Sequence, residues 1–362
     1  MIVCVIISPG VYGQELANDQ EIEVERLLKR LNKPALISIK SEDGDIIDCV
    51  PIHSQLAFDH PLLKNHTIQM RPSFTPESTS TATYTMNKRK ATQAWNKNGR
   101  CPENTVAIRR IMKEDILRSK SIENFGKKTT QGILLYGANA IHEYAVMRAA
   151  PGTFFGTRFV LNVWEPYVQY DTEFSLAQTW LVSGSGSNLN SIEAGFQVYK
   201  QKYGDKQLRL FVFWTPNGYP TSRGCYNTDC PGFVQVSKNL IVGGAFKPVS
   251  QYNGTQIEVI VTIWKETGGY RSTMKLLVND NIGGRHTNTK MGSGEFAEQG
   301  YKKASFFRNI TTTDQYNRPV EPQVSTIATK VNCYNIKQGA SGTSWGVNFY
   351  YGGPGGQNAN CR

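Results

Sequence analysis

The feature that most constrains the fold is a series of short runs rich in Val, Ile, Phe, Thr and Trp beyond Ala150. Gly, Asn and Pro separate these runs, and no long helical pattern interrupts them. Branched and aromatic side chains favour extended backbone, whereas the separating residues favour turns. We therefore expect an antiparallel β-sandwich. The runs are TRFVLNVW, LRLFVFWT, FVQVS, QIEVIVTIW and STMKLLV.

The first third of the chain follows a different pattern, with helix and hairpin signals. In Glu21–Leu31, apolar residues recur on one helical face, and Pro34 ends that helix. The turn-forming residues Glu42–Asp45 lie between two short apolar runs, which predicts a β-hairpin. The spacing of apolar residues in Ile108–Ile116 predicts a second helix. A small α+β domain should therefore precede the sheets.

The basic residues gather in one connecting segment. The chain has a net charge of +11, and Asn87–Lys128 alone holds twelve basic and four acidic residues. A nucleic-acid-binding surface is not expected to concentrate its charge in this way, so we expect no nucleic-acid partner. Lys127-Lys128 precedes a Thr-Thr-Gln-Gly sequence and looks like an exposed, cleavable linker. We divide the chain into residues 1–13, 14–128 and 129–362.

The start of the chain and its cysteines indicate export. Residues 1–13 resemble a short secretory signal with Ile2–Ile7 as its apolar core. Cys4 lies within it, and the remaining six cysteines favour disulfides in an oxidising compartment. We expect a secreted protein, in the cell wall or vacuole. No apolar run reaches the roughly 18 residues that cross a bilayer, so we expect no membrane partner.

Proximity predicts the pairing of these cysteines. The shorter loops favour Cys225–Cys230 and Cys333–Cys361, which leaves Cys49–Cys101 to close the N-terminal domain. A zinc site is less favoured, because no His lies near the first pair and its spacing is unlike that of metal ligands. Three Asn-x-Ser/Thr sequences are compatible with glycosylation. They begin at Asn65, Asn253 and Asn309.

Carboxylates are the best candidates for chemistry. SGSGSN at 183–188 is not a nucleophile elbow, no HExxH motif occurs, and Cys225 has a disulfide partner nearby. Glu193 lies in LNSIEAGFQVY, and Glu295 and Glu298 lie in MGSGEFAEQGY. Two carboxyl groups held together can split their pKa values, so that one activates water and the other protonates a leaving amine. By spacing alone, other acidic residues qualify equally: Asp171, Glu173 and Glu258.

An ordered set of motifs runs through the chain: DCVPIHSQLAFDHP, CPENTVAIRR, HEYA, FSLAQTW, LNSIEAGFQV, RLFVFWTPNGY, RGCYNTDCPGFVQ, MGSGEFAEQGYKKASFFRN and the terminal cysteine pair. Together they resemble the neprosin family of plant secreted proteins, which combine an activation peptide with a neprosin-type domain. The resemblance covers nearly the whole chain. It implies a zymogen of a glutamic-type, proline-directed endopeptidase that acts on peptides or proteins, is active in acid, and needs neither a metal nor an organic cofactor.

The resemblance also implies catalytic positions. Glu193, in the IEAG motif, falls on the first catalytic glutamate and would act as general base on water. The second family glutamate directly precedes the last glycine of its motif, where this chain has Gln299. We therefore expect either Glu298 to supply this carboxyl group or the activity to be weakened. Because adjacent strand residues point to opposite faces, Glu298 would need a bulge, and Glu295 shares a face with Gln299 but lies far along it.

Four further residues are candidates for holding a peptide. Tryptophans in such strands more often pack in a core than bind substrate, and a structural hydrogen bond is an equal alternative for Gln and Tyr. The candidates are Gln178, Trp180, Trp214 and Tyr226.

The basic segment before the β domain suits an inhibitory propeptide. It would lie over an acidic cleft and leave when carboxylates take up protons. We expect residues 14–128 to be the propeptide, 129–362 to be the catalytic domain, and the protein to be a monomer. Two other functions stay open. A non-catalytic relative would bind wall carbohydrate or peptides, which Gln299 favours. A β-sandwich glycoside hydrolase would also use two carboxylates.

Overall fold

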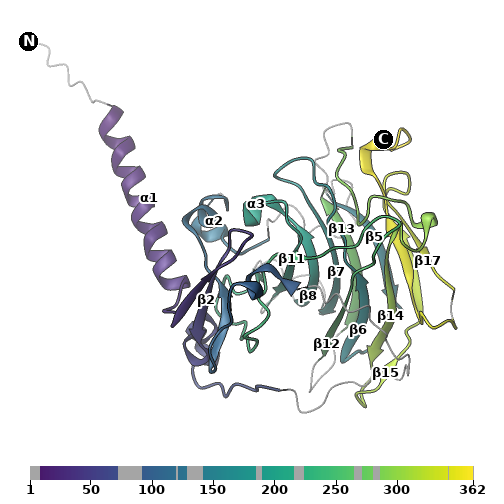
Figure 1. The fold of residues 1–362 in the computed structure, drawn as a ribbon, viewed down its shortest axis with the longest axis horizontal. Helices are drawn as coiled ribbons and strands as arrows, with labels where there is room; N and C mark the ends of the chain where they lie inside the picture. The colour runs from purple at the N-terminus through teal and green to yellow at the C-terminus, as the bar shows by residue number, and fades with distance from the viewer. Residues whose placement is uncertain are drawn as a thin grey trace, which may run out of the picture.

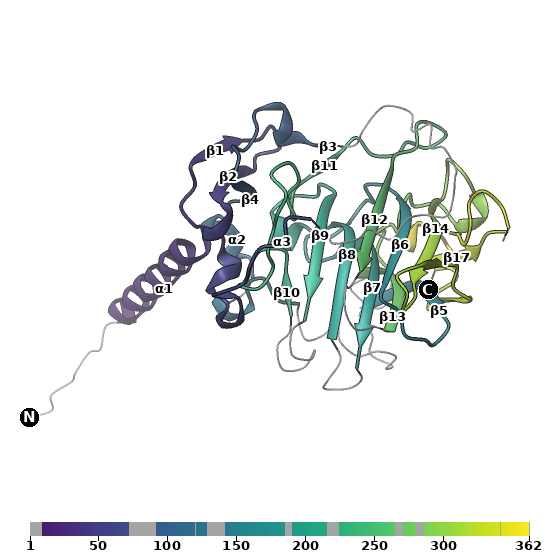
Figure 2. The same ribbon diagram turned by 90° about the horizontal axis from the view of Figure 1, so that it is seen from below.

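The computed structural model describes residues 9–71, 92–119, 121–128, 142–184, 190–215, 224–264, 271–279, 286–340 and 342–361 (Figure 1). The N-terminal domain forms one end of the molecule, and α1 (Pro9–Leu31) extends away from it. The β-rich domain forms the other end, with its strands side by side in Figure 2. None of the described helices is long and apolar enough to cross a membrane.

A three-stranded sheet organises the N-terminal domain, in the order β1 (Ile37–Lys40), β2 (Ile46–Pro51), β4 (Thr105–Arg109). The predicted hairpin is therefore present. The predicted second helix is wrong in its first half, because residues 105–109 pair with β2 and complete the sheet. Only α2 (Lys113–Leu117) is helical, and it packs against the last turns of α1. The apolar side chains between them are Val24, Leu27, Leu31, Leu56, Ile111, Ile116 and Phe125.

The larger domain contains a seven-stranded antiparallel sheet. Its central strands are long, and both of their faces carry buried side chains, such as Trp180 on one face and Phe196 on the other. The order of its strands is β10 (Cys225–Tyr226), β9 (Arg209–Trp214), β8 (Asn190–Val198), β7 (Phe174–Ser183), β13 (Arg271–Asn279), β5 (His142–Ala149), β16 (Val324–Ala328).

A second antiparallel sheet shares a core with the first. Its order is β12 (Glu258–Trp264), β6 (Gly156–Asn162), β14 (Ser305–Thr313), β18 (Phe349–Gly352), β17 (Asn335–Gln338), with β15 (Pro319–Val320) beside β14. The core between the sheets includes Met147 and Phe196 of the first sheet and Phe159, Phe307 and Phe349 of the second. The mainly β, antiparallel architecture expected from the sequence is confirmed.

Short helices connect these strands. They are α3 (Lys200–Tyr203) and the 3-10 turns η1 (Ile52–Ser54), η2 (Leu56–Asp59), η3 (Pro61–Leu63), η4 (Ala94–Lys97), η5 (Ile122–Asn124), η8 (Ala297–Gln299) and η9 (Gly355–Gln357).

One predicted strand, FVQVS at 233–237, is not a strand. Its backbone runs along the N-terminal domain and bonds to a side chain there. Gln235 N donates to Gln55 Oε1 at 2.8 Å, and Gln55 Nε2 donates back to the Gln235 carbonyl at 3.0 Å. The segment therefore pairs with a side chain of the N-terminal domain instead of with another strand. Its strand-forming residues contribute to the interface between the domains.

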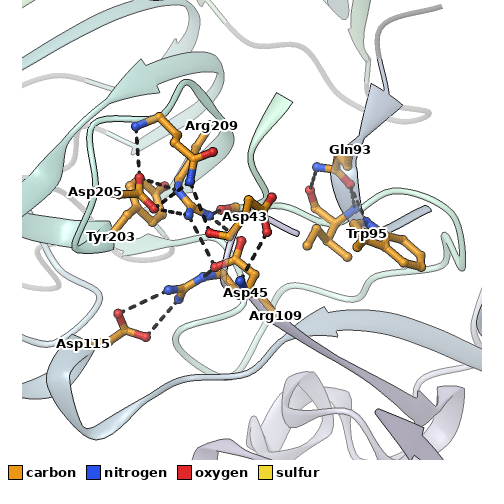
Figure 3. Close-up of polar contacts among 12 residues, drawn as sticks. Asp43, Asp45, Gln93, Trp95, Arg109, Asp115, Tyr203, Asp205 and Arg209 are labelled. Carbon is orange, nitrogen blue, oxygen red and sulfur yellow. Dashed lines mark hydrogen bonds and ion pairs between the residues drawn. The ribbon is translucent and has the colours of Figure 1, made fainter. Parts of the chain in front are cut away.

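Another contact of this kind joins the two domains nearby. The short strand β3 (Thr92–Gln93) pairs with β11 (Phe246–Lys247) of the β-rich domain. Gln93 Nε2 donates to the Ile241 carbonyl at 2.7 Å, and Gln93 Oε1 accepts from Ile241 N at 2.8 Å and from Trp95 Nε1 at 3.1 Å (Figure 3). Gln93 and Trp95 are almost completely buried, so the N-terminal domain is anchored by packed, satisfied groups.

The structure contains the three disulfides that the sequence predicts, Cys49–Cys101, Cys225–Cys230 and Cys333–Cys361. Each lies within one domain. Of the three glycosylation sequences, Asn65 and Asn253 are exposed, but Asn309 is only 8% exposed within β14. The expectation for Asn309 is therefore wrong, because its position in a sheet leaves no room for a glycan.

Candidate active site

Glu193 lies on one face of the seven-stranded sheet, on the third strand from the β10 edge. It lies on β8, directly opposite Trp180 of β7 and Phe213 of β9. Alternate residues of a strand point to opposite faces, so Gln178 and Tyr226 share this face with Glu193 by register. The side chains of the other face, such as that of Phe196, enter the core between the sheets. We call the face that carries Glu193 the outer face.

Both carboxylate oxygens of Glu193 have partners, and the side chain is completely buried. Ser191 Oγ donates to Oε1 at 3.0 Å. Lys128 Nζ, from the N-terminal domain, donates to Oε2 at 2.5 Å. Ser191 is itself held, because its N–H donates to Thr215 Oγ1 at 2.6 Å. The carboxylate is therefore fixed in one orientation before any substrate binds.

Aromatic rings surround the ammonium group of Lys128. Its Nζ lies 3.9 Å from the centroid of Phe213, 5.2 Å from that of Trp180 and 6.0 Å from that of Tyr226. The negative faces of such rings attract a cation at these distances. The site therefore combines one carboxylate with a wall of aromatic rings, and in this state a lysine fills it.

The backbone before Lys128 is held against the edge strand β10. Tyr226 N donates to the Gly126 carbonyl at 2.7 Å. Gly126 has φ +72°, and a Cβ there would lie 2.7 Å from Asp229 Cβ and 3.3 Å from Cys225 Sγ. Only glycine fits this crossing of the disulfide loop. The segment that ends at Lys128 is thus held in the site by a backbone hydrogen bond and by close packing against the disulfide loop.

The expected exposed linker at Lys127-Lys128 is consequently wrong for Lys128, whose side chain is 18% exposed. The ion pair with Glu193 and the aromatic wall bury it. The rest of the predicted linker, from Thr129 on, lies outside the described residues. Most of the SGSGSN segment also lies outside them.

Titration behaviour on the outer face follows from burial and from the charge of Glu193. Burial raises the pKa of Tyr144 to about 12, and the negative charges of Glu193 and Glu143 contribute. Burial also raises the pKa of Tyr226 well above its ordinary value, with Tyr199 and Glu193 adding to the shift. Both hydroxyls therefore stay protonated and can donate hydrogen bonds. Burial lowers the pKa of Lys128, although Glu193 opposes that shift.

Gln178 offers an acceptor beside Glu193. It is 1% exposed, and among the described residues its Oε1 accepts no hydrogen bond. An unsatisfied buried oxygen costs about 1–3 kcal/mol, which a substrate N–H would recover. The structure thus brings three of the four predicted binding residues, Gln178, Trp180 and Tyr226, to the outer face.

The fourth residue, Trp214, is not brought there. It follows Phe213 in β9 and so points to the opposite face. Its indole Nε1 donates to the Asn227 carbonyl at 3.4 Å, and a Cβ added at Gly232 would lie 2.7 Å from its ring. The prediction for Trp214 is wrong, because adjacent residues of a strand point to opposite faces and Phe213 already points to the outer face.

The structure does not bring Glu298 beside Glu193. Glu298 and Gln299 are exposed on η8, which packs against β17 and β18, and Glu298 Oε2 accepts from Asn335 Nδ2 at 2.7 Å. The expectation that this segment is a strand is wrong, because the chain makes a 3-10 turn here. Glu295 lies in the turn just before η8. None of the three lies on the strands that flank β8.

The other acidic candidates have structural partners. Glu173 Oε2 accepts from Tyr170 N at 3.1 Å and from the hydroxyl of Thr289. Glu258 pairs with Arg308 at 2.6 Å, and Asp171 is an exposed partner of lysines. Of the acidic candidates, Glu193 is therefore the one that lies among the aromatic rings of the outer face.

Sequence reasoning missed Ser191, Phe213 and the direct role of Lys128. Strand alternation could have found Ser191, which lies two residues before Glu193 on the same strand face. No signal in the sequence pairs Lys128 with Glu193, because 65 residues separate them.

A further polar contact between the domains involves Asp45 and Arg209 (Figure 3). Asp45 of the N-terminal hairpin accepts from Arg209 Nη1 of β9 at 2.7 Å and from Arg109 Nε at 2.8 Å. Asp205 also binds Arg209, at 2.5 Å, and Asp115 binds Arg109, at 3.0 Å. Arg209 is 1% exposed. We call these five residues the Asp45 cluster.

Acid should weaken the Asp45 cluster. Burial raises the pKa of Asp205, but the hydrogen bond and the charge of Arg209 together outweigh burial. The pKa of Asp205 therefore lies below its ordinary value of 3.8. A carboxyl group with a depressed native pKa stabilises the fold above its ordinary value, and this stabilisation is lost as the pH falls through the native pKa. We expect the amides of the β1–β2 hairpin of the full chain to be less protected below about pH 3.8 than at pH 7, when each exchange rate is divided by the intrinsic rate at the same pH.

Asp205→Asn tests this expectation. The variant removes the titrating group and should show a smaller loss of hairpin protection, relative to intrinsic exchange, between pH 7 and pH 3. An unchanged pH dependence would show that Asp205 does not carry the effect.

Two family models match most of the chain. A neprosin activation peptide model matches residues 38–148, and a neprosin model matches residues 171–283 and 276–354. The chain belongs to the neprosin family. An activation peptide that precedes the domain it controls is the arrangement of a zymogen. In this neprosin-family chain, Lys128, which pairs with the Glu193 carboxylate, lies in the segment that the activation peptide model matches.

Two crystal structures of scytalidoglutamic peptidase are similar over 58% of this chain and 97% of theirs. One holds a peptide-based transition state analog, and the other holds a transition state analog inhibitor. Sequence identity is 13% for both, and the TM-scores are 0.29 and 0.28. A similarity of this size carries no information about the chemistry of Glu193.

Proposed function

We propose that this chain is the exported zymogen of a neprosin-like glutamic endopeptidase, in which Glu193 activates water and the N-terminal domain is the inhibitor. The observation that carries the proposal is the buried Glu193 carboxylate, which Ser191 orients and Lys128 covers. While Nζ lies on Oε2, the Lys128 side chain fills the space that an attacking water needs. Departure of the propeptide frees the carboxylate for general-base chemistry.

The neighbouring residues suit a peptide substrate. The free Oε1 of Gln178 can accept a substrate N–H. The protonated hydroxyls of Tyr144 and Tyr226 can donate to a substrate oxygen. Aromatic walls suit an apolar side chain such as proline, which is the cleavage preference we propose. A partner carboxyl group would protonate the leaving nitrogen, and the exposed position of Glu298 weakens its claim to that role.

A cleavage assay distinguishes the three functions. The acid-treated full chain is incubated with a proline-rich peptide and, separately, with a polysaccharide at about pH 3–5, near ordinary carboxyl pKa values. Cleavage of the peptide after proline supports the proposal. Cleavage of the polysaccharide would make the protein a glycoside hydrolase, and inactivity on both would make it a non-catalytic relative. The placement of Glu298 away from Glu193 favours the last of these rivals.

Maturation should cut the chain within Asn124–Gly132 and leave a domain that starts near Thr129. Residues up to Lys128 fill the site and must leave, whereas β5, from His142, lies between β13 and β16 and must stay. N-terminal sequencing after acid incubation checks this. A start before Arg118 or after Leu135 would show that the boundary is misplaced.

A further inference from the structure

We propose that the aromatic-walled space at Glu193 is a binding site for a primary alkylammonium group, so that lysine side chains presented to it inhibit the enzyme. This inference rests on the proposed function of Glu193 and adds the class of ligand that the site recognises. The released propeptide fragment ending near Lys128 would then inhibit the mature enzyme as a product.

The geometry selects an ammonium ion. Ser191 already occupies Oε1 of Glu193, which leaves Oε2 as the oxygen that meets the ligand. One oxygen suits a compact ammonium group, whereas the planar guanidinium of arginine binds best with two parallel hydrogen bonds. The Phe213 centroid is 3.9 Å from Nζ, so the ring contacts the charge directly.

A peptide backbone can reach the same position. β10 is an edge strand of the seven-stranded sheet, and edge strands accept added peptide segments through main-chain hydrogen bonds. The bond from Tyr226 N to the Gly126 carbonyl is one such contact. It holds the backbone so that the side chain two residues later enters the aromatic wall and meets Glu193. A free peptide that pairs with β10 and carries a lysine two residues after the hydrogen-bonded carbonyl can place its ammonium group at Glu193 in the same way.

Occupancy by an ammonium group blocks chemistry instead of promoting it. Nζ fills the space beside Oε2 where an attacking water would have to lie. A peptide that places lysine here therefore binds without being cleaved at Glu193. This accounts for a lysine, rather than an apolar residue, at the position that seals the zymogen.

The test uses the full chain with Lys128→Ala, which removes three carbons and the amine and leaves a space for a small ligand. The probe is n-propylammonium, the neutral control is 1-propanol, and binding is followed at pH 7 by isothermal titration calorimetry. We expect saturable binding of n-propylammonium that is at least about tenfold tighter than that of 1-propanol, because hydrogen bonds to charged groups are the stronger ones. Ethylguanidinium should bind more weakly than n-propylammonium.

Two matched variants complete the test. Adding Glu193→Gln to Lys128→Ala should weaken n-propylammonium binding by about tenfold or more, since it removes the anionic partner. The unaltered chain should not bind the probe, because Lys128 fills the site. Equal binding of the alcohol and the ammonium, or equal binding after Glu193→Gln, would overturn the inference. If Lys128→Ala does not fold, Lys128→Ser serves in the same titration.

The outcomes separate this inference from the proposed function. Ammonium binding that depends on Glu193, in a protein that cleaves no peptide, would keep the site and remove the peptidase. Peptide cleavage that depends on Glu193, without ammonium binding, would keep the peptidase and remove this inference.

Discussion

Glu193→Gln is expected to lower peptide cleavage by the mature protein by about 10²–10⁴-fold, the usual contribution of a general base. The amide keeps the shape of the side chain and can still accept from Ser191, but it cannot take the proton of water. The mature domain should stay folded, because Lys128 has left it and the single amide oxygen still accepts from Ser191. Initial rates on a proline-containing peptide measure the effect.

Glu298→Gln is the matched control, since it makes the same chemical change at an exposed site whose recorded partner is Asn335. We expect its activity to stay within about twofold of the unaltered protein, as surface substitutions usually do. Comparable activity in Glu193→Gln would remove Glu193 from the mechanism. Loss of activity in Glu298→Gln alone would make Glu298 the working carboxyl group and would require η8 to move toward β8.

Asp45→Ala is expected to destabilise the attachment of the N-terminal domain by about 1–3 kcal/mol, because Arg209 and Arg109 lose the carboxylate that they share, although Asp205 and Asp115 still bind them. Arg209 is 1% exposed and would face Arg109 with no acid between them. The melting temperature of the full chain should fall, and the N-terminal domain should become susceptible to trypsin at neutral pH. Differential scanning calorimetry and the rate of tryptic cleavage measure the two effects.

Glu42→Ala is the control for this prediction. Glu42 lies three residues earlier in the same hairpin and pairs with Lys97, but both side chains are more than half exposed. Such surface pairs contribute about 0–1 kcal/mol. If Asp45→Ala and Glu42→Ala behave alike, the Asp45 cluster does not hold the domains together.

The candidate site was predictable only in part. The IEAG resemblance pointed to Glu193, and its burial on β8 agrees with a role for it. The second glutamate could not be placed from a motif, because the face that a side chain presents depends on whether its segment is a strand. MGSGEFAEQGY turned out to contain a 3-10 turn packed against β17 and β18, so arguments from strand alternation did not apply to Glu298.

By itself, the sequence determined the properties that depend on local pattern. Alternating apolar residues specify antiparallel strands, since one strand face must be buried, and closely spaced cysteines specify their own pairing. Only the tertiary structure decided which distant groups meet. Lys128 lies on Glu193, and Asp45 lies on Arg209, although each pair is separated by many residues. A buried charge requires a partner of opposite sign, but this requirement does not say which residue supplies it until the strands are in register.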